Sequence, residues 1–388
     1  MFFLASFLVT FAVLLVFHQW ASAAFPWVGE RRRALAVLLA LLWAEQTVTG
    51  WIATHWQSRL VDGAHTTGSI LVMTAGIAAA PIVLLRGLSW ALARARRKTP
   101  AEDGELDRKA VMTRRQIVEG AGGVAVLGAS GAVLGWGAVR GRHMFEICDV
   151  PVRIPGLPRV LDGYTIAQIS DLHMGVHLAE RDLDAGLALV RKVRPDLVVV
   201  TGDIVDHDAT FTPFIARKLA DLAARDGVAA ILGNHDHYAG ASAVGDALRA
   251  AGVDLLINQG RVLRPQDGGG FALLGVDDRW SYRHGGEGAR LDRALSMVPA
   301  DAPRILLSHQ PPTVDQWAGR VALQLSGHTH GGQINPGFRP ADLFFRYVAG
   351  TYDVGGTTLY VNRGFGTVGP PSRVGAPPEV TRIVLVAA

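Results

Sequence analysis

Two histidines separated by a single residue, His328 and His330, are the first residues of this sequence whose spacing suggests chemistry. They lie between glycines in residues 326–333, directly after the apolar run 321–325. In an extended segment alternate side chains point to the same face, so both imidazoles are expected to face one site. Two imidazoles on one face suggest a metal ion. A single His-x-His motif is a weak signal, because two surface histidines give the same pattern.

Four polar groups upstream strengthen the metal hypothesis, because each follows an apolar run of the kind that forms a strand. Their members can all bind metal ions: Asp171 and His173; Asp203 and Asp206; Asn234, His235 and Asp236; and His309. In open α/β sheets, ligands gather at the carboxyl ends of the strands, where these groups fall. Five such groups in register with five strands argue against a chance arrangement.

The elements that would position these groups begin near residue 150, where short β-rich runs alternate with helical stretches. The pattern predicts strands at 164–169, 197–200, 229–232, 271–276, 305–307 and 321–325, with helices at 178–193, 214–224 and 243–251. Strands that are apolar throughout are buried on both faces, which requires helices on each side of a sheet. The sequence therefore predicts an α/β domain.

The first third of the chain is rich in Ala, Leu and Val and carries few charges. Its apolar runs predict about four transmembrane helices, at 2–17, 34–53, 68–85 and 121–139. Basic residues stay on the cytoplasmic side, and they cluster at 31–33 and in a linker at about 91–117, whereas loop 55–67 holds only Arg59. All three loops therefore agree on one topology.

Charge supports a division into a transmembrane region, residues 1–140, and a globular domain, residues 141–388. The first holds 14 Lys and Arg against 8 Asp and Glu, and the second holds 24 against 26. The globular domain lacks the basic excess of a nucleic-acid-binding protein, so no nucleic-acid partner is expected. The loop charges place this domain on the extracytoplasmic side of the cell membrane.

Arg114 and Arg115 stand just before the fourth apolar run. Residues 113–118 are similar to a twin-arginine export signal, although they lie inside the chain. The alternative is that the two arginines form the cytoplasmic flank of a membrane span. Both interpretations place the following domain outside the cytoplasm, and cleavage of the segment stays an open question.

The ordered set Asp-x-His, Gly-Asp-x-x-Asp, Gly-Asn-His-Asp, His and Gly-His-x-His resembles the calcineurin-like metallophosphoesterase superfamily. The likeness is stronger to its bacterial membrane-anchored branch, because it continues through residues 331–335, 359–364 and 377–380. It covers about residues 144–388, and the membrane region is matched only in kind. The resemblance implies a four-layer α/β/β/α sandwich preceded by a bundle of about four transmembrane helices.

The resemblance also implies two divalent metal ions and a role for each motif residue. One ion would be held by Asp171, His173 and His330, the other by Asn234, His309 and His328, with Asp203 as the bridge. His235 would face the scissile phosphate, with Asp206 orienting its ring. Imidazole and oxygen ligands without thiolate suit Mn, Fe, Zn or Ni. A hydroxide bridging the two ions would attack phosphorus, and His235 would protonate the leaving group.

These observations predict a metal-dependent phosphoric ester hydrolase embedded in the cell membrane by several spans. The expected substrate is a phosphate monoester, a phosphodiester or a pyrophosphate. Anchoring favours a lipid-linked phosphate or pyrophosphate, with the lipid bilayer as a partner. The resemblance suggests UDP-2,3-diacylglucosamine as one hypothesis, because some members of the superfamily cleave its pyrophosphate. The alternative function is a non-catalytic, membrane-tethered binding or assembly module built on a phosphoesterase fold.

Several neighbouring residues carry weaker signals. Arg279 and Arg363 are candidate phosphate contacts, although an arginine on a loop is more often solvated. Four histidines lie near the motifs but fall outside the family pattern: His177, His207, His237 and His284. The apolar residues between Phe338 and Val348 are expected in the core. If they are exposed, they would suit an acyl chain or the bilayer surface.

Overall fold

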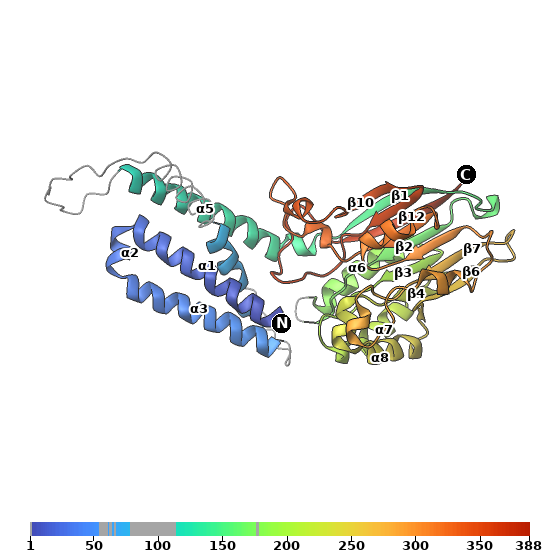
Figure 1. Ribbon diagram of the computed structural model, residues 1–388, viewed down its shortest axis with the longest axis horizontal. Coiled ribbons are helices and arrows are strands. Elements are labelled where there is room, and N and C mark those ends of the chain that lie inside the picture. Colours follow the sequence, from blue (N-terminus) through green and yellow to red (C-terminus); the bar gives the residue numbers. More distant parts are fainter. Residues whose placement is uncertain (1, 54–60, 62–63, 66, 78–113, 176–177) are drawn as a thin grey trace. The chain divides into compact units, whose positions relative to one another are not determined.

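The computed structural model describes residues 2–53, 61, 64–65, 67–77, 114–175 and 178–388. The chain separates into two compact units, Met1–Gly135 and Trp136–Ala388. Figure 1 shows helices in the first unit and the strands, with further helices, in the second. The mixed α/β prediction for the globular part is confirmed.

The first unit is built of apolar helices. The longer helices and the short one between them are α1 (Phe2–Ala24), α2 (Pro26–Glu30), α3 (Arg32–Ala53) and α5 (Arg114–Val139), the last of which runs on into the second unit. Among the described residues, three segments are long and apolar enough to cross a membrane: Phe7–Ala24, Arg32–Ile52 and Gly120–His143. Three of the four predicted spans are thus confirmed as helices of sufficient length.

The remaining predicted span is only partly covered by the described residues. A shorter apolar helix occupies Thr67–Ile77, and residues 78–85 lie outside the described part of the chain. Most of the predicted basic linker at about 91–117 also lies outside it. Within the described helices, a side chain on Gly123 would collide with the ring of Trp20, which is 2% exposed. Small residues of this kind let apolar helices approach closely.

In the described part of the second unit, twelve strands form two six-stranded sheets, whose arrangement Figure 1 shows. The first sheet has the order β1-β12-β2-β3-β4-β5, with bounds Glu146–Ile154, Glu379–Ala387, Thr165–Ile169, Leu197–Thr201, Val228–Ile231 and Asp254–Leu255. The second has the order β10-β11-β9-β8-β7-β6, with bounds Gly350–Val354, Thr357–Val361, Leu323–Ser326, Arg304–Leu307, Phe271–Gly275 and Gln259–Leu263.

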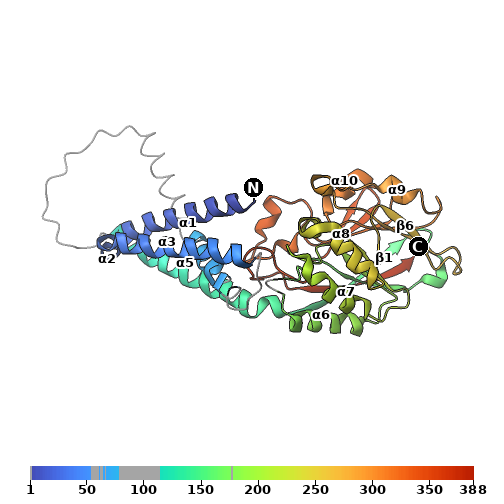
Figure 2. The ribbon, with the colours of Figure 1, turned by 90° about the horizontal axis from the view of Figure 1, so that it is seen from below.

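The central strands of each sheet run parallel. In the first sheet β2, β3, β4 and β5 are parallel neighbours, and in the second β7, β8, β9 and β11 are. The connecting helices are α6 (Glu180–Val193), α7 (Thr212–Ala220), α8 (Asn234–Ala250), α9 (Leu291–Leu295) and α10 (Val314–Trp317). Figure 2 shows α6 and α7 along one side of this unit and α9 and α10 along the opposite side.

Alternate residues of each central strand enter different apolar clusters. In β3, Val198 and Val200 pack with residues of α6, α7 and α8, whereas Leu197 and Val199 pack against the second sheet. On the far side of the second sheet, Leu306 packs with residues of α9 and α10. The sheets therefore face each other with helices on their outer surfaces, as strands that are apolar on both faces require.

Two local expectations were wrong. Helix α8 begins at Asn234, nine residues before the predicted start, because the Asp236 carboxylate accepts a hydrogen bond from the Gly233 N–H (2.9 Å) and caps the helix there. The His-x-His motif is not extended. His328 and His330 have φ angles of 72° and 51°, in the left-handed region, and His330 opens a short 3-10 turn, His330–Gly332.

Candidate metal centre

The predicted site residues lie where parallel strands of both sheets end. Strands β2, β3 and β4 of the first sheet and β8 and β9 of the second each pass directly into one of the five motifs. Because carboxyl ends of parallel strands meet at the same edge of a sheet, the motifs come together although 159 positions separate the first from the last. Strand register therefore brings distant side chains into one place.

Backbone conformation is unusual throughout this edge. Five non-glycine residues with φ between 45° and 72° are among those predicted to bind metal: Asp171, His173, Asp203, His328 and His330. L-residues rarely adopt this left-handed region, and such strained positions gather at functional sites. Gly327 is needed for a different reason, since a Cβ there would come within 2.2 Å of an Asp171 carboxylate oxygen.

The first group of side chains consists of Asp171, His173 and His330, all of them buried. The Nε2 atoms of His173 and His330 are 3.1 Å apart, and His330 Nε2 is 3.7 Å from Asp171 Oδ1. The backbone N–H of His328 donates to the Asp171 carboxylate at 2.9 and 3.0 Å. The turn that carries His328 and His330 therefore also holds the Asp171 carboxylate in place.

The second group consists of Asp203, His309 and His328. His309 Nε2 lies 3.1 Å from Asp203 Oδ2 and 3.2 Å from His328 Nδ1. His309 Nδ1 donates to the carbonyl oxygen of Thr201 at 2.8 Å, so a neutral His309 presents the lone pair of Nε2 to the group. Asp203 Oδ2 is also 3.6 Å from His173 Nε2, which places Asp203 between the two groups.

The donor set fits metal ions. Nitrogens bound about 2.0–2.1 Å from one ion lie roughly 2.9–3.4 Å apart in octahedral or tetrahedral geometry. Both observed nitrogen pairs, at 3.1 and 3.2 Å, fall in this range. The Oδ1 atom of Asn234 is buried without a hydrogen-bond partner among the described residues, and a metal ion would satisfy it.

His235 and Asp206 form a separate contact beside these groups. His235 Nδ1 is 2.9 Å from Asp206 Oδ1, the contact expected of a carboxylate that orients the ring. Asp206 does more than predicted, since its Oδ1 is also 3.4 Å from His173 Nδ1. His207 Nε2 lies 3.6 Å from the same oxygen. Asp206 thus faces three imidazoles.

The charges of the protein alone drive the pKa values of the histidines apart. Burial opposes charge on His309 and His235, yet Asp203 raises their pKa values to about 10 and about 9. Burial, followed by repulsion from His309, lowers the pKa of His328 to about 3. His330 also has a pKa well below its usual value because of burial and its histidine and arginine neighbours. Imidazoles this close cannot all be protonated, because their positive charges repel one another. A divalent cation would instead interact favourably with all of the neutral rings.

Two buried residues of the site had not been given a role. The Asp236 carboxylate accepts hydrogen bonds from the N–H groups of Ile204 and Val205 at 2.9 and 3.1 Å, in addition to that of Gly233. It therefore joins the loops after β3 and β4. Its place in the Gly-Asn-His-Asp motif was a usable signal.

Arg373 is the second of these residues, and its side chain is only 1% exposed. Its Nη2 lies 3.2 Å from His330 Nδ1, and it donates to the carbonyl oxygens of Gly366 and Ala376 at 2.9 and 3.0 Å through Nε and Nη1. Burial lowers its pKa to about 9. Arg373 lies 43 positions after His330 and belongs to none of the five motifs, so the motifs do not identify it.

The residues that carried weaker signals in the sequence lie in different surroundings from one another. Arg363 forms ion pairs with Glu379 and, at 3.0 Å, with Glu146. These pairs explain it as a structural residue. Arg279 lies 5.7 Å from the ring of Trp280, which in turn lies 6.0 Å from the ring of His328. His237 is engaged by Asp277 at 2.7 Å.

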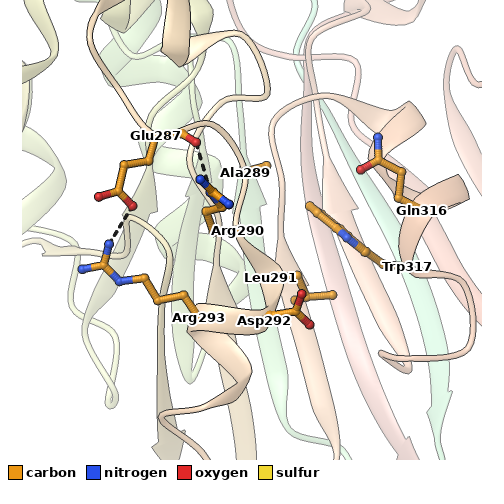
Figure 3. Close-up of a pocket in the computed structure, with 8 residues that line it drawn as sticks. All are labelled: Glu287, Ala289, Arg290, Leu291, Asp292, Arg293, Gln316 and Trp317. Atoms are coloured by element: carbon orange, nitrogen blue, oxygen red, sulfur yellow. Dashed lines mark hydrogen bonds and ion pairs between the residues drawn. The ribbon is translucent and has the colours of Figure 1, made fainter.

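A hollow of about 380 Å³ lies elsewhere, at the outer side of the second sheet. Figure 3 shows its lining, with Arg293 directed to Glu287 and Trp317 opposite. The Arg293–Glu287 pair is 2.7 Å long, and Arg290 Nε donates to the Glu287 carbonyl at 3.3 Å. None of the predicted site residues lines it.

Comparison with known proteins agrees with this geometry. Residues 164–332 match the family model for calcineurin-like phosphoesterase. An uncharacterized metallophosphoesterase of Bacillus subtilis, YkuE, is 34% identical over 284 residues, which is 71% of this chain and 98% of that protein. An uncharacterized metallophosphoesterase of Campylobacter jejuni, Cj0846, is 37% identical over 61% of this chain and 62% of that protein. The zebrafish transmembrane protein with metallophosphoesterase domain is 32% identical over 64% of this chain and 59% of that protein.

The fold and the clustered histidines and aspartates define a metal-dependent phosphoester hydrolase. Specifically, the chain belongs to the calcineurin-like metallophosphoesterase family. The resemblance seen in the sequence is thereby confirmed, as is the presence of side-chain clusters able to hold metal. The chain spans about three fifths of the Campylobacter and zebrafish proteins.

Proposed function

We propose that this protein is a membrane-anchored phosphoesterase in which the residues at the strand ends hold two divalent cations. The proposed ligands are Asp171, His173 and His330 for one cation, Asn234, His309 and His328 for the other, and Asp203 between them. The observation that best supports this assignment is the position of Asp203, which shares a close cluster with His309 and His328 and another with His173. Its carboxylate has two oxygens and can therefore serve both ions.

When bound, the cations would supply an activated water and offset the charge that grows on the phosphoryl oxygens. The chain itself provides the proton for the leaving group. Because Asp206 engages His235 Nδ1 at 2.9 Å, the ring is held in one orientation and Nε2 remains to donate. In the metal-free protein, attraction to Asp203 and Asp206 raises the pKa of His235 to about 9 against the effect of burial. Asp206 is not among the proposed ligands, so its attraction for the proton on His235 persists when the cations are bound.

The membrane part of the proposal is supported by the apolar helices. Three described segments are long enough to span a bilayer, and the zebrafish and bovine relatives are named transmembrane proteins. The arginines at 31–33 and the basic residues at about 91–117 favour the cytoplasmic side for these loops. We therefore place the catalytic domain on the extracytoplasmic side of the cell membrane.

The catalytic assignment is tested with the full-length protein in detergent. Metal content and hydrolysis of an aryl phosphodiester are measured for the parent, Asp203→Ala and His235→Ala, with Asp149→Ala, an exposed carboxylate on β1, as the control. We expect Asp203→Ala to lose metal and activity, and His235→Ala to lose activity while keeping metal. Unchanged rates in both variants would refute the assigned roles, and absence of hydrolysis by the parent would favour the non-catalytic assembly module.

The substrate needs a separate test. The metals recognise the phosphoryl group, whereas the surrounding loops determine what else is bound. We propose a lipid-linked phosphate or pyrophosphate, with UDP-2,3-diacylglucosamine as the specific hypothesis. Turnover of that nucleotide lipid is compared with turnover of simple aryl phosphomonoesters and phosphodiesters. Faster hydrolysis of the simple esters, with no cleavage of the lipid, would eliminate the hypothesis.

A further inference from the structure

The residues between Phe338 and Phe345 form an exposed apolar loop beside the metal centre. Four large apolar side chains in this loop are exposed: Phe338 by 65%, Leu343 by 79%, Phe344 by 81% and Phe345 by 48%. The expectation that this stretch belongs to the core is wrong for these four residues and right for Tyr347 and Val348, which are buried. Exposed apolar patches of this kind mark an interaction surface.

We infer that this apolar loop docks on the surface of the lipid bilayer and holds the metal centre at the level of the lipid headgroups. The inference of a bilayer contact is drawn from the structure around the loop and does not depend on the proposed function. Only its consequence for substrate choice rests on the proposed phosphoesterase function.

The residues that flank the loop on either side are hydrogen-bonded to the turn at the metal centre. At its start, Asn335 Nδ2 donates to the carbonyl oxygen of Gly331 at 2.9 Å, next to His330. At its end, the hydroxyl of Thr329, which lies between the two histidines of the motif, donates to the carbonyl oxygen of Val348. Both flanks of the loop are therefore hydrogen-bonded to the turn that carries His328 and His330.

The same part of the fold packs on the end of an apolar helix. Gly137 and Gly141 belong to the apolar segment Gly120–His143, and the N–H of Arg373 donates to the Gly137 carbonyl at 3.2 Å. A Cβ on Gly137 would lie 2.8 Å from a methyl group of Val374. If this segment spans the bilayer, its end lies at the membrane surface, and so do the residues packed on it.

Segment 372–374 connects that helix end with the apolar loop. The Val374 N–H donates to the Gln333 carbonyl at 2.9 Å, and the Asn335 N–H donates to the Val374 carbonyl at 2.7 Å. Arg373 contacts His330 from the same segment. The helix end, the metal centre and the start of the apolar loop are thus neighbours within one compact unit.

The composition of the loop suits the interface between lipid and water. Arg339 and Asp342 pair at 2.8 Å, so the loop carries no unpaired charge between its phenylalanines. Arg346, which is exposed and 3.2 Å from Asp315, follows the apolar residues. Aromatic and aliphatic side chains flanked by arginine enter the boundary of the acyl region while the charged groups stay in water.

The contact is tested by depth-dependent fluorescence quenching with the full chain. Cys148 is the single cysteine, so a Cys148→Ser background allows one environment-sensitive probe at Phe344→Cys. The protein is reconstituted in phosphatidylcholine–phosphatidylglycerol vesicles containing doxyl-labelled phosphatidylcholine. Val160→Cys is the matched control, because Val160 is 67% exposed and precedes β2, at the opposite end of that strand from the metal centre.

We expect strong quenching at position 344 and little at position 160. Equal, weak quenching at both positions would overturn the inference. Cross-linking of position 344 between two chains, without quenching by the doxyl lipid, would also overturn it and assign the loop to a second copy.

Catalysis provides an independent readout that separates the two proposals. A Leu343→Ser/Phe344→Ser variant is assayed on 4-methylumbelliferyl hexadecyl phosphate in vesicles and on the soluble methyl analogue. We expect about a tenfold or larger loss of kcat/KM on the hexadecyl ester, and a change of less than about twofold on the methyl ester. Equal losses on both esters would overturn the inference. No hydrolysis of either ester by the parent would show that these phosphodiesters are not substrates, and the quenching result would then decide the inference alone.

Discussion

The metal centre and the outer hollow bring charged side chains together in opposite ways. In the hollow, Glu287 and Arg293 pair at 2.7 Å, and the positive and negative charges offset each other. In the metal centre, His173 Nε2 faces His330 Nε2 at 3.1 Å, and His309 Nε2 faces His328 Nδ1 at 3.2 Å. The hollow thus brings opposite charges together, whereas the centre brings imidazole nitrogens together at distances that suit a shared cation.

This difference shows that a cavity alone is a poor guide to function in this fold. The hollow is lined by exposed charged residues such as Glu287 and Arg293 and by the buried apolar side chains of Leu291 and Trp317. The metal centre is built from buried polar groups whose cost of burial is met only if each group has a partner. Each of the following predictions changes one side of this comparison.

The largest effect is expected for Asp203→Asn, which keeps the shape of the side chain and removes its charge. Among the described residues, Asp203 is the one carboxylate that shares a close cluster with His173 and another with His309 and His328, so the variant should hold at most one cation. Loss of several kcal/mol of transition-state stabilisation predicts a fall in kcat of about 10³-fold or more. Metal content by mass spectrometry and hydrolysis of an aryl phosphodiester test this. A variant that keeps two ions per chain would contradict the bridging role.

The effect expected for Arg373→Met is smaller. Arg373 holds the chain behind His330 by donating to the carbonyl oxygens of Gly366 and Ala376, and its guanidinium packs against the His330 ring, with Nη2 3.2 Å from Nδ1. Loss of a residue that positions a predicted ligand lowers metal affinity by about 10–100-fold. Competition titration with a metal-binding dye measures that affinity. Arg225→Met is the control, since Arg225 is half exposed and pairs with Asp196 before β3. Equal affinities in the two variants would show that Arg373 only fills space.

Sequence reasoning identified the residues that cluster at the strand ends more completely than it identified their surroundings. Strand ends and residue types were sufficient to place His309 beside Asp203, because strand register fixes which carboxyl ends meet. The left-handed turn of His328 and His330 was not predictable, since it depends on contacts with Asp171 from another sheet. Arg373 was missed for the same reason. Its role comes entirely from tertiary packing against His330.

The helices and strands were likewise predicted well only where the local sequence determines the structure. Strands β3 and β8 were predicted within a residue because their apolar runs are continuous and bounded by polar residues. The start of α8 was missed because its N-terminal residues also carry the metal motif. The exposure of Phe344 was missed because composition cannot distinguish an apolar core segment from an apolar surface loop.

Removal of metal is predicted to reverse the pH dependence of stability. In the metal-free protein the pKa values of His235 and His309, about 9 and about 10, lie above the unfolded value of about 6.5. Their stabilising contribution is therefore complete below about pH 6.5 and is lost as the pH rises toward 9–10. Metal binding requires neutral imidazoles, so the metal-loaded protein should gain stability as the pH rises through the lower part of this range, from about pH 6.5.

Tm values measured by tryptophan fluorescence at pH 6.5, 8 and 9.5, with and without chelator, test the prediction. His237 also has a raised pKa, with burial opposing the effect of Asp277, but this pair lies outside the predicted ligands and contributes to both samples. The difference between the two pH profiles therefore isolates the metal centre. Parallel profiles would mean that the histidine cluster does not bind the added ions.

The smallest effect is expected in the outer hollow. Glu287→Gln breaks the 2.7 Å pair with Arg293, but both side chains are more than half exposed, and exposed pairs stabilise proteins by only about 0–1 kcal/mol. The predicted change in kcat/KM on an aryl phosphodiester is less than about twofold, because no predicted ligand lines the hollow. Steady-state kinetics in parallel with Asp203→Asn provide the comparison. A loss of tenfold or more in Glu287→Gln would show that the hollow takes part in substrate binding and that the two regions act together.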